Sequence, residues 1–295
     1  MRLGGIEAGG TKFVCVVGDG GTEIEAEARF ATRDPESTLG DALSFFREAT
    51  AVGPLDAVGV AAFGPLELRR SESRYGFITT TPKPGWSGTD LVGPLRRELG
   101  IPVGIDTDVN GAALAEGRWG AAQGMRSFVY VTVGTGIGGG AVVDGRPVHG
   151  LVHPEMGHLS VTREPGDDFP GQCPFHGDCF EGMASGSAMA ARWGRPGEEL
   201  TGADLVRAVE LEAAYLAAGF RNVVYALAPE RIVVGGGIIN LPGLFPLLRS
   251  RLAESVGGYP GLPEHSSDDF VQPAALGQLA GALGALALAE RALTG

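Results

Sequence analysis

The chain has 295 residues, of which 44% are hydrophobic and 20% are charged, and its net charge is −12. This balance excludes an extended disordered chain, and the length is sufficient for two domains of ordinary size. The acidic total disfavours broad nucleic-acid binding, and the basic residues form no cluster along the chain.

Three features of the sequence bear on where the protein works. Three cysteines, with Cys15 inside an apolar run, are too few for a disulfide scaffold and indicate a reducing compartment. The opening residues MRLGGIEAGGTK lack the apolar stretch of a secretory signal. The uncharged tract Phe270–Ala289 is interrupted by Pro273 and by glycines, and therefore predicts a buried helix at about Gly277–Ala292. We expect a cytoplasmic protein with no membrane or nucleic-acid partner.

The first part of the chain predicts three strands followed by alternating helices and strands. Apolar and β-branched runs between turn glycines predict the strands, and apolar residues at helical spacing predict the helices. The expected strands are Leu3–Ile6, Phe13–Val17, Ile24–Phe30, Asp56–Ala62 and Val103–Asp106, and the expected helices are Thr38–Thr50 and Asp90–Leu99. The element order is βββαβα.

The second part of the chain repeats this order. The expected elements are strands Phe128–Val133 and Gly140–Val143, a tight hairpin at Asp144-Gly145, helices Gly186–Trp193 and Gly202–Ala228 with Thr201 as N-cap, strand Arg231–Val234, the segment Pro242–Ser255 and the final helix. An internal duplication is the economical interpretation. We therefore expect an α/β fold with two such halves facing across a cleft. The predicted domains are 1–119 and 120–295, and the last helix is a candidate to pack on the first.

Glycines cluster at three turns, Gly9-Gly10, Gly134–Gly139 and Gly235–Gly237. Glycine allows backbone N–H groups to approach a phosphate closely, and Thr11, Lys12 and Thr135 add hydroxyl and cationic donors. One such hairpin is usually only a tight turn. Two at matching places of a duplicated fold predict a pair of phosphate-binding loops. The third turn is either an adenosine contact or a plain strand-to-helix turn.

Asp108 lies between the strand ending at Asp106 and an expected helix Val109–Gly117. An aspartate there is either the N-cap of the helix or a catalytic base. As a base it would accept the proton of a sugar hydroxyl while that oxygen attacks the γ-phosphorus of a nucleotide. The segment Thr81–Trp86 would supply polar groups and an aromatic face nearby, although an indole is more often a packing residue.

Cys173, His176 and Cys179 stand three residues apart, and His158 precedes them. Together the four side chains would form the tetrahedral S2N2 set that zinc prefers. The alternative is a disulfide, or buried thiols with surface histidines. We expect zinc, and four protein ligands make it structural because no position stays open. Glu155 and Glu181 flank these residues.

These stretches together resemble the ROK (repressor, ORF, kinase) family of sugar kinases, most closely its fructokinase branch, over essentially the whole chain. The motifs are IEAGGTK, FGP at 63–65, TTPKPGW, DTDVNGAALAEG, VTVGTGIGGG, HPEMGH, CPFHGDCFEGMASGSA and IVVGGGI. The resemblance implies the actin-like ATPase (ribonuclease H-like) fold, ATP with Mg²⁺, phosphoryl transfer to the C6 hydroxyl of a hexose, and a homodimer.

The resemblance also implies roles for single residues. It makes Asp108 the base and places Glu7 near magnesium and phosphates. Glu155 and Glu181 would bind sugar hydroxyls, and His158 would ligate zinc and also face the sugar. Further sugar-site candidates are Gly64, Lys83 and Asn110. The nucleotide-site candidates are Gly9, Gly10, Thr11, Lys12, Thr135, Gly136, Ser187, Gly235, Gly236, Gly237, Ile238 and Ile239.

Three positions depart from the commonest family pattern. They are Glu7 where many members have Asp, Thr107 where many have Asn before the base, and Lys83 where Asn is frequent in relatives that act on glucose. Fructokinase-like members share these features, so we expect phosphorylation of D-fructose to D-fructose 6-phosphate. A kinase for glucose, mannose or an N-acetylhexosamine is the alternative. A sugar-responsive regulator is a more distant alternative, since regulators of this fold carry an N-terminal DNA-binding segment and here the first strand is expected at Leu3.

Overall fold

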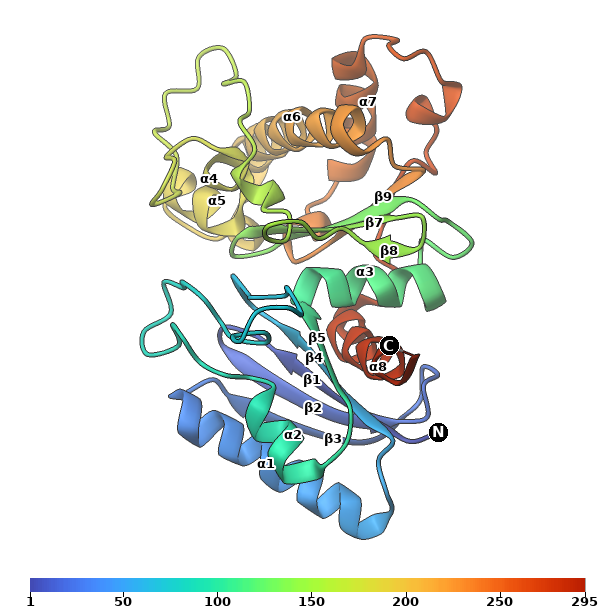
Figure 1. The fold of residues 1–295 in the computed structure, drawn as a ribbon. Coiled ribbons are helices and arrows are strands. Elements are labelled where there is room, and N and C mark those ends of the chain that lie inside the picture. Colours follow the sequence, from blue (N-terminus) through green and yellow to red (C-terminus); the bar gives the residue numbers. More distant parts are fainter. Residues whose placement is uncertain (295) are drawn as a thin grey trace. The chain divides into compact units, whose positions relative to one another are not determined.

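The computed structural model describes residues 1–294, which divide into two compact units (Figure 1). Unit 1 contains Met1–Gln123, Pro147–Pro154 and the chain from Gln278 onward, and unit 2 contains Gly124–Arg146 and Glu155–Gly277. Because each unit is built from separated stretches, residues far apart in sequence meet inside one unit.

Unit 1 is built on a five-stranded sheet of order β3-β2-β1-β4-β5. Strands β1 (Leu3–Ala8), β2 (Lys12–Gly18) and β3 (Ile24–Ala31) form an antiparallel meander, and β4 (Ala57–Ala62) and β5 (Val103–Thr107) run parallel to β1. β1 and β4 lie in the middle of the sheet and are buried almost throughout. Parallel pairing of β1, β4 and β5 places their carboxyl ends at one edge.

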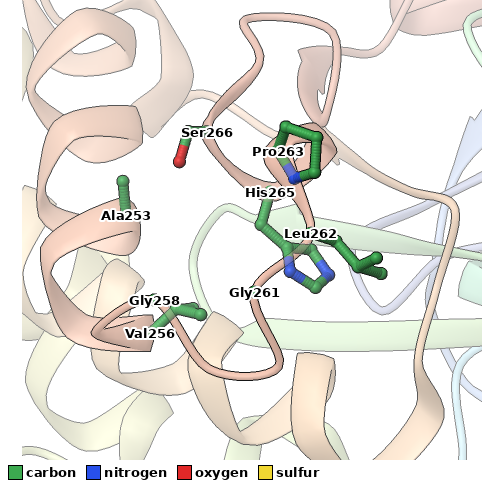
Figure 2. A pocket seen from close by; sticks show the side chains of 8 residues that line it. All are labelled: Ala253, Val256, Gly258, Gly261, Leu262, Pro263, His265 and Ser266. Carbon is green, nitrogen blue, oxygen red and sulfur yellow. The ribbon is translucent and has the colours of Figure 1, made fainter.

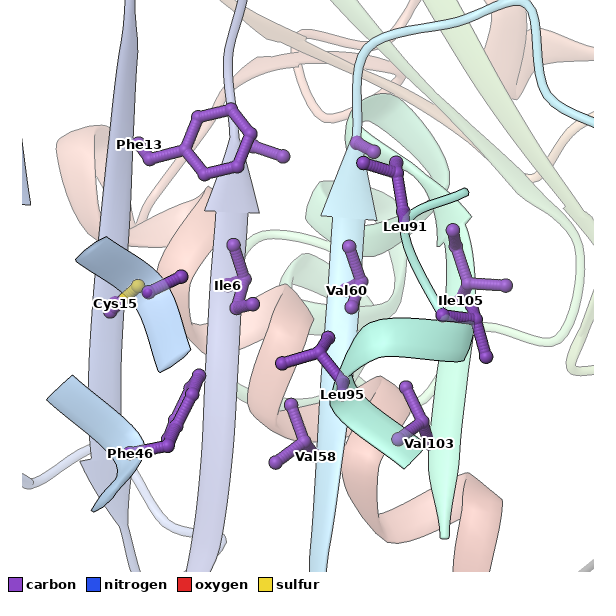
Figure 3. Close-up of a cluster of buried hydrophobic side chains, with 14 of the residues drawn as sticks. Ile6, Phe13, Cys15, Phe46, Val58, Val60, Leu91, Leu95, Val103 and Ile105 are labelled. Atoms are coloured by element: carbon purple, nitrogen blue, oxygen red, sulfur yellow. The ribbon is translucent and has the colours of Figure 1, made fainter. Parts of the chain in front are cut away.

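Helices α1 (Pro35–Val52) and α2 (Gly93–Leu99) cover one face of this sheet (Figure 1). α1 begins after Asp34, whose carboxylate accepts a hydrogen bond from the Ser37 N–H at 2.9 Å, as an N-cap does. Apolar side chains from the strands and from both helices form the core between them, including Phe13, Phe46 and Leu95 (Figure 3).

The opposite face is covered by α3 (Asp108–Trp119) and α8 (Ala280–Thr294). The approach of α8 is close because glycines in the strands lack side chains. A Cβ placed on Gly59 would lie 1.9 Å from the Ala285 carbonyl oxygen. The last helix therefore packs on the first sheet, and its expected first turn is the 3-10 helix η5 (Gly277–Leu279).

Unit 2 contains a sheet of order β10-β9-β6-β7-β8. Its strands are β6 (Phe128–Val133), β7 (Ile137–Val143), β8 (Arg146–Pro147), β9 (Arg231–Gly235) and β10 (Val271–Pro273). β6 is antiparallel to β7 and parallel to β9, as β1 is to β2 and β4. The two sheets therefore have the same strand order, and the expected duplication is confirmed.

Helices α4 (Phe180–Ala184), α5 (Gly186–Trp193), α6 (Gly202–Leu227) and α7 (Leu244–Val256) belong to unit 2. α6 packs against α7 and α4. Short 3-10 helices are η1 (Met156–His158), η2 (Gly197–Glu199), η3 (Ile238–Asn240) and η4 (Pro263–Ser266). The sequence did not predict α4 or β10, because segments this short carry no recognisable periodicity. Over residues 1–294, no helix has the length and apolarity needed to cross a membrane.

One expected turn is shorter than predicted. β7 begins at Ile137, so Gly138 and Gly139 pair with Thr132 and Val131 of β6 instead of lying in the turn. The turn itself is Gly134–Gly136, closed by a 2.9 Å hydrogen bond from the Gly134 N–H to the Gly136 carbonyl. Glycine is needed at Gly139 because a Cβ there would lie 2.5 Å from the Met156 sulfur.

Candidate functional site

The carboxyl ends of β1, β4 and β5 carry the candidate residues of unit 1. Glu7 lies near the end of β1 and the turn 9–12 follows that strand, Gly64 lies just beyond β4, and Asp108 directly follows β5. Because these strands are parallel neighbours, residues separated by up to a hundred positions meet at one edge of the sheet.

Asp108 is the first residue of α3, but Thr107 is its N-cap. The Thr107 hydroxyl accepts a hydrogen bond from the Asn110 N–H at 3.1 Å. Asp108 Oδ1 accepts from the adjacent Val109 N–H, at 2.9 Å. The N-cap interpretation of Asp108 is therefore wrong, because the neighbouring hydroxyl already performs that function.

The two carboxylates at this edge affect each other. Burial raises the pKa of Asp108 to about 6, with a smaller contribution from the charge of Glu7 and against the Val109 hydrogen bond. Burial also raises the pKa of Glu7, while Lys12 and Arg29 lower it. An aspartate with this pKa is ionised at neutral pH and is a stronger base than an ordinary carboxylate.

Asn110 is buried on the first turn of α3, 1% exposed. Its Nδ2 donates to Asp106 Oδ1 at 2.7 Å, and the Thr107 N–H donates to the same oxygen at 2.8 Å. Among residues 1–294, no hydrogen-bond partner is found for Asn110 Oδ1. Asp106 thus fixes the orientation of the Asn110 amide, and Asn110 Oδ1 remains available as an acceptor.

Of the two interpretations of Trp86, packing residue or aromatic face of the site, the structure supports the packing residue. Trp86 is fully buried, its ring lies 5.6 Å from that of Phe13 and 5.4 Å from that of Phe63, and its Nε1 donates to the Arg33 carbonyl at 2.9 Å. The indole is therefore a core residue. Lys83, three positions earlier in the same loop, is partly exposed.

Unit 2 contains a pocket of about 900 Å³ at the carboxyl ends of the parallel strands β6 and β9 and at the start of α5. Four expected nucleotide residues line it, namely Thr135, Ser187, Gly237 and Ile238. Gly134 of the expected second glycine turn also lines it. The sequence did not predict the remaining lining residues, which are Gly186, Ala190, Pro196, Gly197, Glu198, Leu200, Leu205, Asn240, Leu241 and Pro242. Most of these have apolar side chains that resemble ordinary core residues in sequence.

Gly136, Gly235, Gly236 and Ile239 do not line this pocket. Gly236 has φ +92°, and a Cβ there would lie 2.2 Å from the Val133 carbonyl oxygen. A Cβ on Gly235 would lie 2.3 Å from the Tyr130 hydroxyl oxygen. These two glycines allow the end of β9 to pack against β6, so their position explains their residue type without a ligand contact.

A second pocket, of about 340 Å³, lies between α7 and η4 (Figure 2). Its lining residues are Ala253, Val256, Gly258, Gly261, Leu262, Pro263, His265 and Ser266. None of the expected site residues is among them, and we assign it no role.

His158, Cys173, His176 and Cys179 converge as the sequence predicts, with one ligand atom from each lying within 4.8 Å of the others. His158 ends η1 and Cys179 is the N-cap of α4. Cys173 begins a narrow turn that is closed by paired backbone hydrogen bonds with Gly177, at 3.2 and 2.9 Å. All three cysteines are free, so the disulfide alternative is wrong.

The distances among these atoms fit a tetrahedral zinc ion. The two Nδ1 atoms are 3.3 Å apart, and Cys173 Sγ lies 3.7 and 3.8 Å from them; Cys179 Sγ lies 3.7 Å from His158 Nδ1. Ordinary zinc bond lengths in a tetrahedron give about 3.3 Å between nitrogens and about 3.6 Å between nitrogen and sulfur. Burial and the adjacent Cys173 raise the pKa of Cys179 to about 11, so a thiolate pair needs a cation.

Glu181 connects this cluster to the glycine turn. It lies in the first turn of α4, and its Oε2 accepts a hydrogen bond from the Ile137 N–H at 2.9 Å. A Cβ on Gly136 would lie 2.5 Å from the same oxygen, so the absence of a side chain there admits the carboxylate. Glu155 is exposed and precedes η1, where its carbonyl accepts from the His158 N–H at 3.0 Å.

Solved structures identify the class to which this fold belongs. The ROK hexokinase of Thermus thermophilus matches with a TM-score of 0.77 at 32% identity, covering 100% of this chain and 99% of that one. A ROK family glucokinase of Streptomyces griseus, in complex with glucose and AMPPNP, matches with a TM-score of 0.74 at 25% identity, covering 99% and 100%. The fold is the actin-like ATPase fold of sugar kinases.

The sequence comparisons then give the family. The model of the ROK family matches residues 3–292. The fructokinase of Zymomonas mobilis is 46% identical over 289 residues, which are 97% of this chain and 95% of that protein. The chain belongs to the ROK family.

Proposed function

We propose that this protein is an ATP-dependent hexose kinase that transfers the γ-phosphoryl group of ATP to the C6 hydroxyl of D-fructose. Family membership and the match to a hexokinase support the kinase class. The identity of 46% with a fructokinase supports the sugar. The observation that carries the chemistry is Asp108, a carboxylate released from helix capping whose pKa is about 6.

In the proposed reaction Asp108 acts as the general base. It is ionised at neutral pH, and it takes the proton of the C6 hydroxyl while that oxygen attacks the γ-phosphorus in line. Asn110 Oδ1 is an acceptor for a sugar hydroxyl, since its amide nitrogen is held by Asp106. Gly64 and Lys83 are further sugar contacts in this unit.

The pocket of about 900 Å³ is the proposed adenosine site. Its apolar walls suit a base, and the glycine turns at Gly134–Gly136 and Gly9–Lys12 are proposed to hold the phosphates. The proposed nucleotide contacts include Gly235, Gly236 and Ile239 as part of the turn after β9. Magnesium, when bound, would neutralise charge on the transferring phosphoryl group, and Glu7 with the first glycine turn would hold it.

Zinc is proposed as a structural ion held by His158, Cys173, His176 and Cys179. Because His158 would bind it through Nδ1, the opposite ring nitrogen Nε2 is the atom proposed to face the sugar. Glu155 and Glu181, on either side of the metal loop, are proposed to accept sugar hydroxyls. The ion would fix these side chains without entering the chemistry.

The test is a coupled ADP-release assay with D-fructose, D-glucose, D-mannose and N-acetylmannosamine. We expect fructose to give the highest kcat/KM, and Asp108→Asn to lower kcat at least ~100-fold while fructose and AMPPNP still bind. Asp268→Asn, an exposed aspartate of unit 2, is the matched control and should behave as wild type. Equal turnover with glucose or mannose would reject fructose specificity, and near-normal turnover of Asp108→Asn would reject the base.

Three further parts of the proposal rest on the resemblance and the sequence. They are a homodimer, a cytoplasmic location, and a domain boundary near Gly120. Light scattering of the purified protein tests the first, because a monomer at micromolar concentration would contradict it.

A further inference from the structure

The crossover segment, Pro147–Pro154, joins β8 to the sugar-site residue Glu155 and packs within unit 1. Apolar burial does not hold it there, since Leu151 and Val152 in its middle are 82% and 51% exposed. Its described attachments are two histidine side chains, one toward each end.

His149 attaches the segment to the edge of β5. Its Nε2 lies 3.0 Å from Asp106 Oδ2 and 3.1 Å from Oδ1, and the Asp106 side chain is only 4% exposed. The same carboxylate receives the Thr107 N–H and the Asn110 amide, which belong to the residues on either side of Asp108. His149 is therefore the partner of the carboxylate that shapes the start of α3.

His153 attaches the segment to the end of β4. It is buried, 6% exposed, and its Nε2 accepts a hydrogen bond from the Leu66 N–H at 3.2 Å. A Cβ on Gly64 would lie 3.2 Å from this nitrogen, so the ring fills the space beside the Gly64 backbone. An imidazole nitrogen accepts a hydrogen bond only when it is unprotonated.

We propose that His149 and His153 are positioning residues for phosphoryl transfer, which attach the crossover segment to unit 1 in opposite protonation states. His149, as an imidazolium, pairs with Asp106 and thereby positions the turn Asp108–Asn110. His153 acts as a neutral imidazole on the Gly64–Leu66 backbone. The proposal rests on the proposed function for its kinetic consequence, but not for the attachment itself.

The surroundings support these two protonation states. The hydrogen bond to Asp106 raises the pKa of His149 against burial and the charge of Arg291, and Asn110 Nδ2 also lies 3.3 Å from its ring. Burial lowers the pKa of His153, with His149 acting in the same direction and Asp106 and a backbone contact at Pro154 against it. The ion pair between His149 and Asp106 and the Leu66–His153 hydrogen bond coexist only at pH values between the two pKa values, and each is lost on a different side of that window.

The consequence for the reaction follows from Asp106. When His149 loses its proton, a buried carboxylate loses its counter-charge, and the hydrogen bonds that fix Thr107 and Asn110 lose their optimal geometry. Since Asp108 lies between these two residues, turnover should fall on the alkaline side through kcat. Nucleotide affinity should change little, because the proposed adenosine pocket lies in unit 2.

The experiment combines a titration with kinetics. Histidine side-chain NMR of the full chain, from about pH 5 to pH 9, should give His149 a pKa above the ordinary value of about 6.5 and His153 one below it. Asp106→Asn should lower the pKa of His149. Kinetic profiles are then measured for wild type, His149→Ala and His149→Gln, with His265→Gln of η4 as the matched control.

We expect His149→Ala to lower kcat by about tenfold or more, because the variant loses a hydrogen bond to a charged group. His149→Gln keeps an N–H donor, so it should stay within about threefold of wild type but lose the alkaline fall of kcat. AMPPNP affinity and Tm of both variants should match His265→Gln.

A His149 pKa at or below the ordinary value, or one that Asp106→Asn does not move, would overturn the proposal. A His149→Gln variant that still shows the alkaline fall of kcat would also overturn it. If His149→Ala fails to fold, the wild-type titration and the His149→Gln profile still decide. If the wild type phosphorylates no hexose, the proposed function fails, while the titration continues to test the attachment.

Discussion

At the scale of single residues, four neighbours on the β5–α3 turn have different roles because their surroundings differ. Asp106 is buried and accepts three hydrogen-bond donors, Thr107 caps the helix, Asp108 accepts from the adjacent Val109 N–H, and Asn110 keeps an unused acceptor. In the sequence DTDVN any of the first three residues could have been the cap. Only the hydrogen bond from the Asn110 N–H identifies Thr107 as the cap.

The pKa of Asp108 predicts an acid limb in the activity. Burial and the charge of Glu7 raise this pKa to about 6, and the ionised form is the active base. The value of kcat/KM for fructose should therefore fall towards tenfold per unit below about pH 6 and level off near pH 7, before the alkaline fall that His149 is proposed to cause. The check is a pH–rate profile at saturating ATP, with Tm recorded at each pH to exclude unfolding. A flat profile from about pH 5 to 8 would contradict the assignment.

At the scale of elements, the contact between α8 and the first sheet depends on glycines in the strands. Gly59→Ala would place a methyl group 1.9 Å from the Ala285 carbonyl oxygen. Such overpacking against backbone should lower the free energy of unfolding by about 1–3 kcal/mol or more. Urea denaturation measures this change.

The matched control is Gly40→Ala on the exposed face of α1, where a Cβ meets nothing within 4 Å. This change should raise the free energy of unfolding by about 0.5–1 kcal/mol, as alanine does in a helix interior. Equal effects of the two substitutions would show that the α8 contact is not as close as described.

Helix α6 carries Glu212, a carboxylate that is only 1% exposed. Burial raises its pKa well above the ordinary value, and nearby Arg192 lowers it only in part. The folded state therefore binds a proton that the unfolded chain releases, and stability falls as pH rises above about 4.5 until the folded pKa is reached. Glu212→Gln removes this titration.

We expect Glu212→Gln to match wild type at about pH 5 and to be more stable by about 1–2 kcal/mol at about pH 8. The control is Glu210→Gln, two residues earlier on α6, where the side chain is 45% exposed. It should show no gain in stability that grows with pH. Thermal denaturation at the two pH values measures both. A Glu212→Gln advantage that is equal at both pH values would exclude a buried proton.

At the scale of the whole molecule, the cluster of His158, Cys173, His176 and Cys179 connects two parts of unit 2. Cys179 is the N-cap residue of α4, and Glu181 on the same helix accepts from Ile137 beside the glycine turn. A five-residue helix has little stability alone, so α4 depends on its contacts and would gain stability from the proposed zinc ion at its start.

Removal of zinc should therefore weaken sugar binding before nucleotide binding. After chelation we expect loss of about one equivalent of metal and fructose binding at least about tenfold weaker. AMPPNP binding should follow later, through the Glu181–Ile137 hydrogen bond. Metal analysis, calorimetry with each ligand, and amide exchange over residues 173–184 measure the order. Less than about half an equivalent of zinc in the purified protein, or the reverse order, would count against this role.

The amino-acid sequence by itself determined the features that depend on spacing along the chain. Strand and helix periodicity placed most elements within a few residues, the repeated βββαβα order predicted the two matching sheets, and the Cys173–Cys179 spacing predicted the cluster with His158. These are local patterns, and the backbone geometry of strands, helices and short loops follows directly from them.

The tertiary structure decided what depends on neighbours distant in sequence. It placed Trp86 in the core against Phe13, gave Asp106 its partner His149 from 43 positions away, and gave Leu66 its partner His153 from 87 positions away. It also explained Gly235 and Gly236 by the packing of β9 on β6. Burial, pKa and hydrogen-bond partners depend on which residues the fold brings together, and the local sequence contains no record of those contacts.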